Sequence, residues 1–111
     1  DELIQRRPNF RYEIRDVMEF IPTMTEKDAP VVQAIASGIR AVLGKEPEYV
    51  ISPGTYDQKH IVRIGHLQEC IAYGPGILDL AHQPDEYIVI DDLVNSAKVM
   101  AHATLKLLGI A

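Results

Sequence analysis

Apolar and polar positions alternate along this chain with two different periods, and each period predicts a different kind of element. In residues 10–20 the even-numbered positions are mostly apolar, whereas most odd-numbered positions are charged. A period of two is typical of a β-strand with one buried and one solvated face, although a helix is an alternative for this segment. Apolar segments at 48–51 and 70–73 predict two further strands, and residues 87–90 predict an extended approach to the last helix.

Two helices are predicted before the last quarter of the chain. The first begins near Asp28, which can cap it, continues through Pro30 in its first turn and ends at Gly44. Its apolar face carries Val31, Ile35, Ile39 and Val42. The second predicted helix is short and covers residues 58–64. The order strand, helix, strand within the first fifty residues indicates a unit that needs partner strands to complete a sheet.

The last helix is predicted to run from Asp91, where Asp91 and Asp92 can cap it, to about Leu108 before Gly109. Its apolar face is formed by Leu93, Ala97, Met100, Ala101, Thr104 and Leu108. Its opposite face carries Asn95, Lys98, His102 and Lys106. We therefore expect the first face to be buried and His102 to lie on the surface.

The composition of the chain argues against several classes of function. The 111 residues suffice for one domain and carry a net charge of -5, without a basic patch for nucleic acid or a polybasic arm for a membrane. No apolar run approaches the roughly 18 residues that a membrane helix needs. The single Cys70 excludes an internal disulfide and suits a reducing compartment, so we expect a cytoplasmic protein with neither nucleic-acid nor membrane partners.

One loop, residues 73–87, concentrates the candidate chemistry. It is broken by Gly74, Pro75 and Gly76, and it contains His82, followed by Asp85 and Glu86. A strand end, an irregular loop and a helix start form the corner at which open α/β sheets place their ligands. From the residues alone, His82 is equally consistent with a metal or acid–base role and with an ordinary loop histidine.

A second candidate is the turn at Gly54 and Thr55. Its backbone N–H groups and hydroxyl suit an anion or a carboxylate, and the alternative is an ordinary turn. Gly74 and Gly76 do not form a dinucleotide fingerprint, because the G-x-G-x-x-G spacing is missing. His60 and His66 flank the short predicted helix, and we expect both to be exposed.

Four segments together carry a family resemblance. They are Gly54-Thr55-Tyr56-Asp57, Tyr73-Gly74-Pro75-Gly76, Ala81-His82-Gln83-Pro84-Asp85-Glu86-Tyr87, and Asp91-Asp92-Leu93 at the start of the terminal helix. In order and spacing the chain resembles the C-terminal part of the co-catalytic zinc amidohydrolases and metallopeptidases. That family includes acetylornithine deacetylase, succinyl-diaminopimelate desuccinylase, aminoacylase and glutamate carboxypeptidase.

The resemblance implies an α/β fold in two parts. Residues 1–51 would be the C-terminal half of a two-layer α+β lid domain, through which a homodimer commonly forms. Residues 52–111 would be the C-terminal segment of the catalytic α/β domain. In this family the active site holds two zinc ions, which cobalt or manganese can replace. His82 would be a ligand of one of these metal ions.

The resemblance also implies a reaction and a substrate site. A metal-dependent hydrolase of this kind cleaves the amide bond of an N-acyl amino acid or a dipeptide-like molecule with zinc-activated water. Gly54, Thr55, Gly74 and Gly76 would line the substrate pocket.

The sequence also departs from the family pattern. The other metal ligands and the general base of the family lie in an upstream half, and no matching motif occurs here. We therefore assign no catalytic residue to this chain, and we expect it to be the C-terminal portion of a longer enzyme, inactive and poorly stable alone. The alternative is a stand-alone α/β module for dimerisation or ligand binding, without catalysis.

Overall fold

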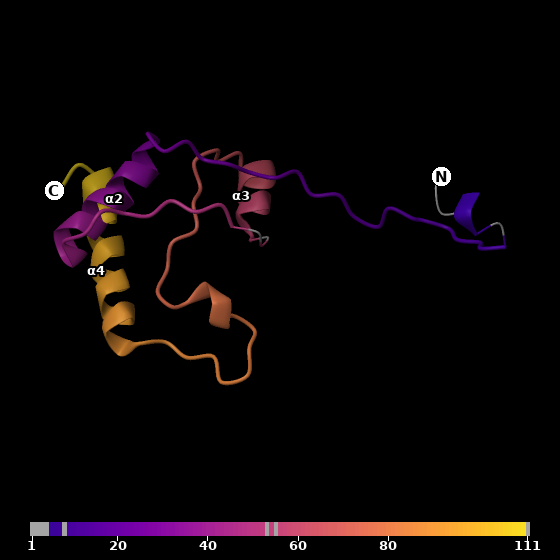
Figure 1. The fold of residues 1–111 in the computed structure, drawn as a ribbon. Helices are drawn as coiled ribbons and strands as arrows, with labels where there is room; N and C mark the ends of the chain where they lie inside the picture. The colour runs from indigo at the N-terminus through magenta and orange to yellow at the C-terminus, as the bar shows by residue number, and fades with distance from the viewer. Residues whose placement is uncertain (1–4, 8, 53, 55, 111) are drawn as a thin grey trace.

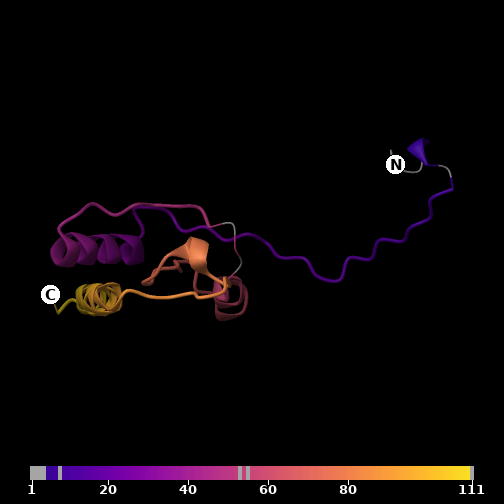
Figure 2. The ribbon, with the colours of Figure 1, turned by 60° about the horizontal axis from the view of Figure 1, so that its bottom comes forward.

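Two helices from opposite halves of the chain lie against each other in the computed structural model (Figure 1). The structure describes residues 5–7, 9–52, 54 and 56–110. Helix α2 spans Pro30–Leu43 and helix α4 spans Ile90–Leu107. Between them come the short helix α3, Gln58–Gly65, and the 3-10 turn η1, Leu78–Leu80. Figure 2 shows α2 and α4 as two adjacent layers.

Local signals explain the boundaries of α2. Pro30 occupies the first turn, where its missing N–H costs nothing, and Gly44 ends the helix in the left-handed conformation with φ 64°. The Gly44 N–H donates to the carbonyl oxygen of Arg40 at 3.0 Å. These features confirm the predicted helix. The predicted cap is wrong, because Ala29 holds the N-cap position and no side chain caps the helix.

Helix α4 also matches its prediction to within one residue at each end. Asp91 and Asp92 lie in its first turn and Lys106 in its last, where each charge opposes the helix dipole favourably. The two aspartates are not caps, because Val89 precedes the helix at that position without a side-chain hydrogen bond. Lys106 Nζ donates to Ser37 Oγ of α2 at 3.0 Å and so ties the two helices together.

Small side chains line the contact between α2 and α4. Helix α2 buries Val32, Ala34, Ala36 and Gly38, and helix α4 buries Ser96, Val99 and Ala103. A Cβ atom at Gly38 would lie 2.8 Å from the carbonyl oxygen of Val99 and 3.1 Å from its Cγ1. The lack of a side chain at Gly38 therefore permits the closest approach of the two backbones.

The predicted buried face of α4 is wrong. Leu93 is 50% exposed, Met100 43% and Leu108 66%, and Ala97, Ala101 and Thr104 are exposed as well. His102 from the predicted surface face is half-buried, and its Nδ1 atom is buried without a hydrogen-bond partner. Because the backbones of α2 and α4 approach closely at Gly38, the small residues of α4 pack against α2, and its larger apolar side chains stay exposed to solvent.

The residues that the structure describes form helices and turns but no β-strand. The predicted strands at 10–20, 48–51 and 70–73 are irregular segments. Residues 87–89 are irregular as well, whereas Ile90 is already the first residue of α4. A strand is held by hydrogen bonds to a neighbouring strand, and no such ladder is formed within the described residues. The α/β class predicted from the sequence is therefore visible here only in its helices, and the lid domain stays a prediction.

The N-terminal segment gives the molecule an elongated shape. Residues 10–20 run away from the helices along an extended path, shown in indigo and violet in Figures 1 and 2, and Val17 is 91% exposed. The radius of gyration is 20.0 Å, whereas a compact domain of this length has about 13 Å. Much apolar surface is therefore exposed.

A three-residue hydrogen-bond network joins the segment before α2 to helix α3. Thr25 Oγ1 donates to the carbonyl oxygen of Cys70 at 2.9 Å and accepts from the Cys70 N–H at 3.2 Å. The amide Nε2 of Gln58, in the first turn of α3, donates to the same carbonyl. The hydroxyl of Thr25 thus satisfies both backbone groups of a half-buried residue that lies 45 positions away.

We expect Thr25→Val to loosen this network. Valine has the same shape but no hydroxyl, so the Cys70 N–H loses its partner at a cost of about 1 kcal/mol. The amide of Cys70 should then exchange its hydrogen roughly five- to tenfold faster in the full-length polypeptide. Thr25→Ser is the control, because it keeps the hydroxyl. An unchanged exchange rate in the valine variant would contradict the role of this bond.

Candidate functional site

The loop 73–87 contains two non-glycine residues in the left-handed backbone region. His82 has φ 64° and Asp85 has φ 63°. This conformation is uncommon for residues with a side chain and costs about 1–2 kcal/mol for each. Short backbone bonds fold the loop, from the Gln83 N–H to the carbonyl oxygen of Leu80 at 3.1 Å and from the Glu86 N–H to that of Gln83 at 3.3 Å. The loop is a defined sequence of turns that follows η1.

His82 presents its side chain at the surface of this loop. The residue is exposed, and its imidazole nitrogens make no hydrogen bond within the described part of the chain. Its backbone N–H donates to Oε2 of Glu86 at 3.1 Å. Asp85 and Glu86 follow His82 closely in the sequence, but the Glu86 carboxylate contacts the backbone of His82 and not its ring. The ring is thus left available for another ligand.

The two loop glycines are open positions. Gly74 and Gly76 are exposed, and a Cβ atom at either would meet nothing within 4 Å. Gly76 has φ +105°, a conformation that residues with side chains rarely adopt, so the turn requires glycine there. Gly74 has no such backbone requirement. The free space beside both leaves room for a molecule to approach the backbone.

The predicted turn at Gly54 is partly described, and Thr55 lies outside the described residues. Gly54 is exposed, and its N–H donates to Ser52 Oγ at 3.2 Å. The Ser52 hydroxyl in turn donates to Tyr56 Oη at 3.0 Å. The N–H group that the sequence suggested for an anion is therefore engaged locally. No hydrogen bond or ion pair among the described residues joins Gly54 to the loop 73–87.

Metal ligation in the described residues is limited to isolated groups. Nowhere in the described ranges do three or more His, Cys, Asp or Glu side chains come together in a way that could hold a metal ion. An exposed imidazole without a hydrogen bond has its ring nitrogens open to a metal ion, which would need further ligands. His82 meets that description, and the remaining ligands of a complete site have no counterpart in the described part of this chain.

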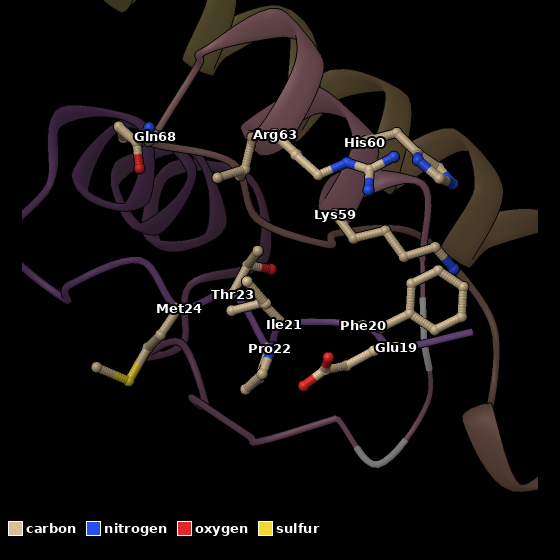
Figure 3. A pocket seen from close by; sticks show the side chains of 11 residues that line it. Glu19, Phe20, Ile21, Pro22, Thr23, Met24, Lys59, His60, Arg63 and Gln68 are labelled. Atoms are coloured by element: carbon tan, nitrogen blue, oxygen red, sulfur yellow. The ribbon is translucent and has the colours of Figure 1, made fainter. Parts of the chain in front are cut away.

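A cavity of about 600 Å³ lies elsewhere, between residues 19–24 and helix α3 (Figure 3). Lys59 Nζ lies 4.1 Å from the ring centroid of Phe20, and the ring of His60 meets that of Phe20 edge-on at 6.5 Å. Glu19 and Arg63 also line it. Among the described residues, none of the site residues predicted from the sequence lines this cavity. Sequence reasoning missed this cavity, because its two walls are distant in sequence and carry no shared motif.

The helices that the structure describes include none that is both long and apolar enough to cross a membrane.

Comparison with known proteins identifies relatives over nearly the whole chain. The model of peptidase family M20/M25/M40 matches residues 6–106. An acetylornithine deacetylase of Myxococcus xanthus is 33% identical over 97% of this chain and 26% of its own length. A succinyl-diaminopimelate desuccinylase of Marinobacter nauticus is 30% identical over 93% of this chain and 26% of its own. A Bacillus subtilis protein named as a putative dipeptidase is 33% identical over 86% of this chain and 20% of its own length.

The chain therefore spans only a fifth to about a quarter of the length of these relatives. No solved structure matches it.

Proposed function

This chain belongs to peptidase family M20/M25/M40, and from that premise we propose that it contributes His82 as one metal ligand to a hydrolase of amide bonds. The resemblance predicted from the sequence is confirmed. The exposed imidazole of His82, presented by a folded loop inside the matched residues 6–106, is the observation that carries the proposal.

The proposed reaction is hydrolysis of the amide bond of an N-acyl amino acid or a dipeptide-like molecule. Water adds to the carbonyl carbon, the C–N bond breaks, and the products are a carboxylate and an amine. Relatives named as a deacetylase, a desuccinylase and a dipeptidase support this substrate class. Family members generally depend on metal ions, and zinc, with cobalt or manganese as substitutes, polarises a carbonyl and lowers the pKa of a bound water.

The residues of this chain then have separate tasks. His82 would bind one of two metal ions through a ring nitrogen. Gly54, Thr55, Gly74 and Gly76 line the substrate pocket, where the open space beside Gly74 and Gly76 admits the acyl group or its amide. We assign no general base to this chain, so water activation depends on groups outside it, and the chain alone is inactive.

The test is a substrate panel applied to the full-length polypeptide that carries this chain. N-acetyl and N-succinyl amino acids, dipeptides and simple carboxylic esters are incubated with it, and released amine is measured beside bound metal. We expect turnover of at least one amide class, loss of turnover with a chelator and recovery with zinc. A full-length protein that binds metal but hydrolyses no amide would contradict the proposal.

The non-catalytic alternative rests on the exposed apolar surface. Leu93, Val94 and Leu105 on α4 are each at least 44% exposed and would suit an interface.

We propose that the full-length protein is a cytoplasmic homodimer, formed through a lid domain that includes residues 1–51. Helix α2, in that segment, packs on α4 of residues 52–111, so the two segments are in contact through these helices. Sedimentation of the full-length protein tests the dimer, and a monomeric full-length protein would contradict it.

A further inference from the structure

Glu86 ties the loop 82–86 together through both its backbone and its side chain. Its N–H donates to the carbonyl oxygen of Gln83 at 3.3 Å, and its carboxylate Oε2 accepts from the His82 N–H at 3.1 Å. We propose that Glu86 is a positioning residue that holds the His82 backbone in the left-handed conformation and thereby aims the imidazole. This inference rests on the proposed function of His82 as a metal ligand.

The need for such a residue follows from the backbone of His82. A φ of 64° places Cβ close to the following carbonyl, so histidine adopts it only when other interactions compensate. The bond to Glu86 is charge-assisted, and such bonds are stronger than those between neutral groups. It is the one hydrogen bond of His82 itself within the described residues. Glu86 is therefore the side chain that stabilises the strained residue.

The conformation of His82 determines the direction of its side chain. If φ returned to the usual negative range, the Cα–Cβ bond would turn relative to the loop and carry the imidazole to a different place. Metal ligation tolerates deviations of only about 0.2 Å in ligand distance. A histidine that samples both conformations would therefore bind metal more weakly, although its ring chemistry is unchanged.

The loop also shows why Glu86 and not its neighbour has this task. Asp85 is itself left-handed with φ 63°, and its carboxylate makes no hydrogen bond within the described residues. The second left-handed residue reverses the chain, so Glu86 comes back across the turn beside the His82 N–H. The two turns and the carboxylate contact thus form one unit.

The experiment compares Glu86→Ala with Glu86→Gln in the full-length polypeptide. Glutamine loses the charge but keeps a side-chain oxygen of the same reach, whereas alanine removes the acceptor. We expect Glu86→Ala to weaken zinc binding about tenfold or more, as loss of groups that support a ligand typically does. Hydrogen exchange of the His82 amide should accelerate about tenfold. Glu86→Gln should restore part of both properties, because its neutral oxygen accepts a weaker hydrogen bond from the same N–H.

Glu48→Ala is the matched control, because Glu48 is exposed and lies outside this loop. Equal damage from Glu86→Gln and Glu86→Ala, or an unchanged His82 exchange rate in Glu86→Ala, would overturn the positioning role. If the unmodified protein binds no zinc, the proposed function fails, and the exchange rate of the His82 amide alone decides whether Glu86 holds the backbone. The two proposals can therefore fail separately.

Discussion

His82→Ala in the full-length polypeptide is expected to remove one bound metal ion and to lower kcat/KM for the amide substrate at least ~100-fold. The imidazole makes no hydrogen bond within the described residues and is exposed, so its removal leaves no buried partner unsatisfied. The fold should therefore stay intact. Metal content by elemental analysis, kinetics and the thermal unfolding midpoint together check this result.

His66→Ala is the matched control for that variant. His66 is also an exposed histidine with a positive φ, 54°, and it ends helix α3 in the left-handed conformation. Alanine should therefore strain the backbone similarly at both positions. We expect His66→Ala to keep its metal and its activity. Full activity in His82→Ala, or equal losses in both variants, would show that His82 is not a ligand.

Gly38→Ala is expected to weaken the packing of helix α2 against helix α4. The new Cβ would lie 2.8 Å from the carbonyl oxygen of Val99, a backbone atom that can move only with helix α4. Such overpacking costs about 1–3 kcal/mol, against a gain of about 1 kcal/mol in helix propensity. The net loss is about 0–2 kcal/mol, and its middle value of about 1 kcal/mol corresponds to about fivefold faster hydrogen exchange in α2 and α4 of the full-length polypeptide.

Gly65→Ala separates the steric effect from helix propensity. Gly65 is the last residue of α3, and a Cβ atom there would meet nothing within 4 Å. Alanine should therefore leave exchange in α3 unchanged or slow it slightly. If Gly38→Ala also slowed exchange in α2 and α4, the close contact at Val99 would not limit the packing of the two helices.

Local chemistry explains why the helices were predictable from the sequence. Pro30 and Gly44 bound α2, and Gly109 follows α4 with φ 70°. These residues act through their own backbone preferences and need no distant partner. The family resemblance was equally readable, because the motif around His82 is contiguous in sequence. The strands were not confirmed in the described residues, since a strand exists only through pairing with another segment.

The sequence by itself determined helices α2, α3 and α4, the loop with its candidate ligand and the family. Only the tertiary structure decided which face of α4 is buried, because that depends on how closely Gly38 lets two backbones approach. It also decided that Glu86 bonds to the backbone of His82 and not to its ring. Both outcomes depend on left-handed turns and steric fit between residues, which the hydrophobic pattern does not encode.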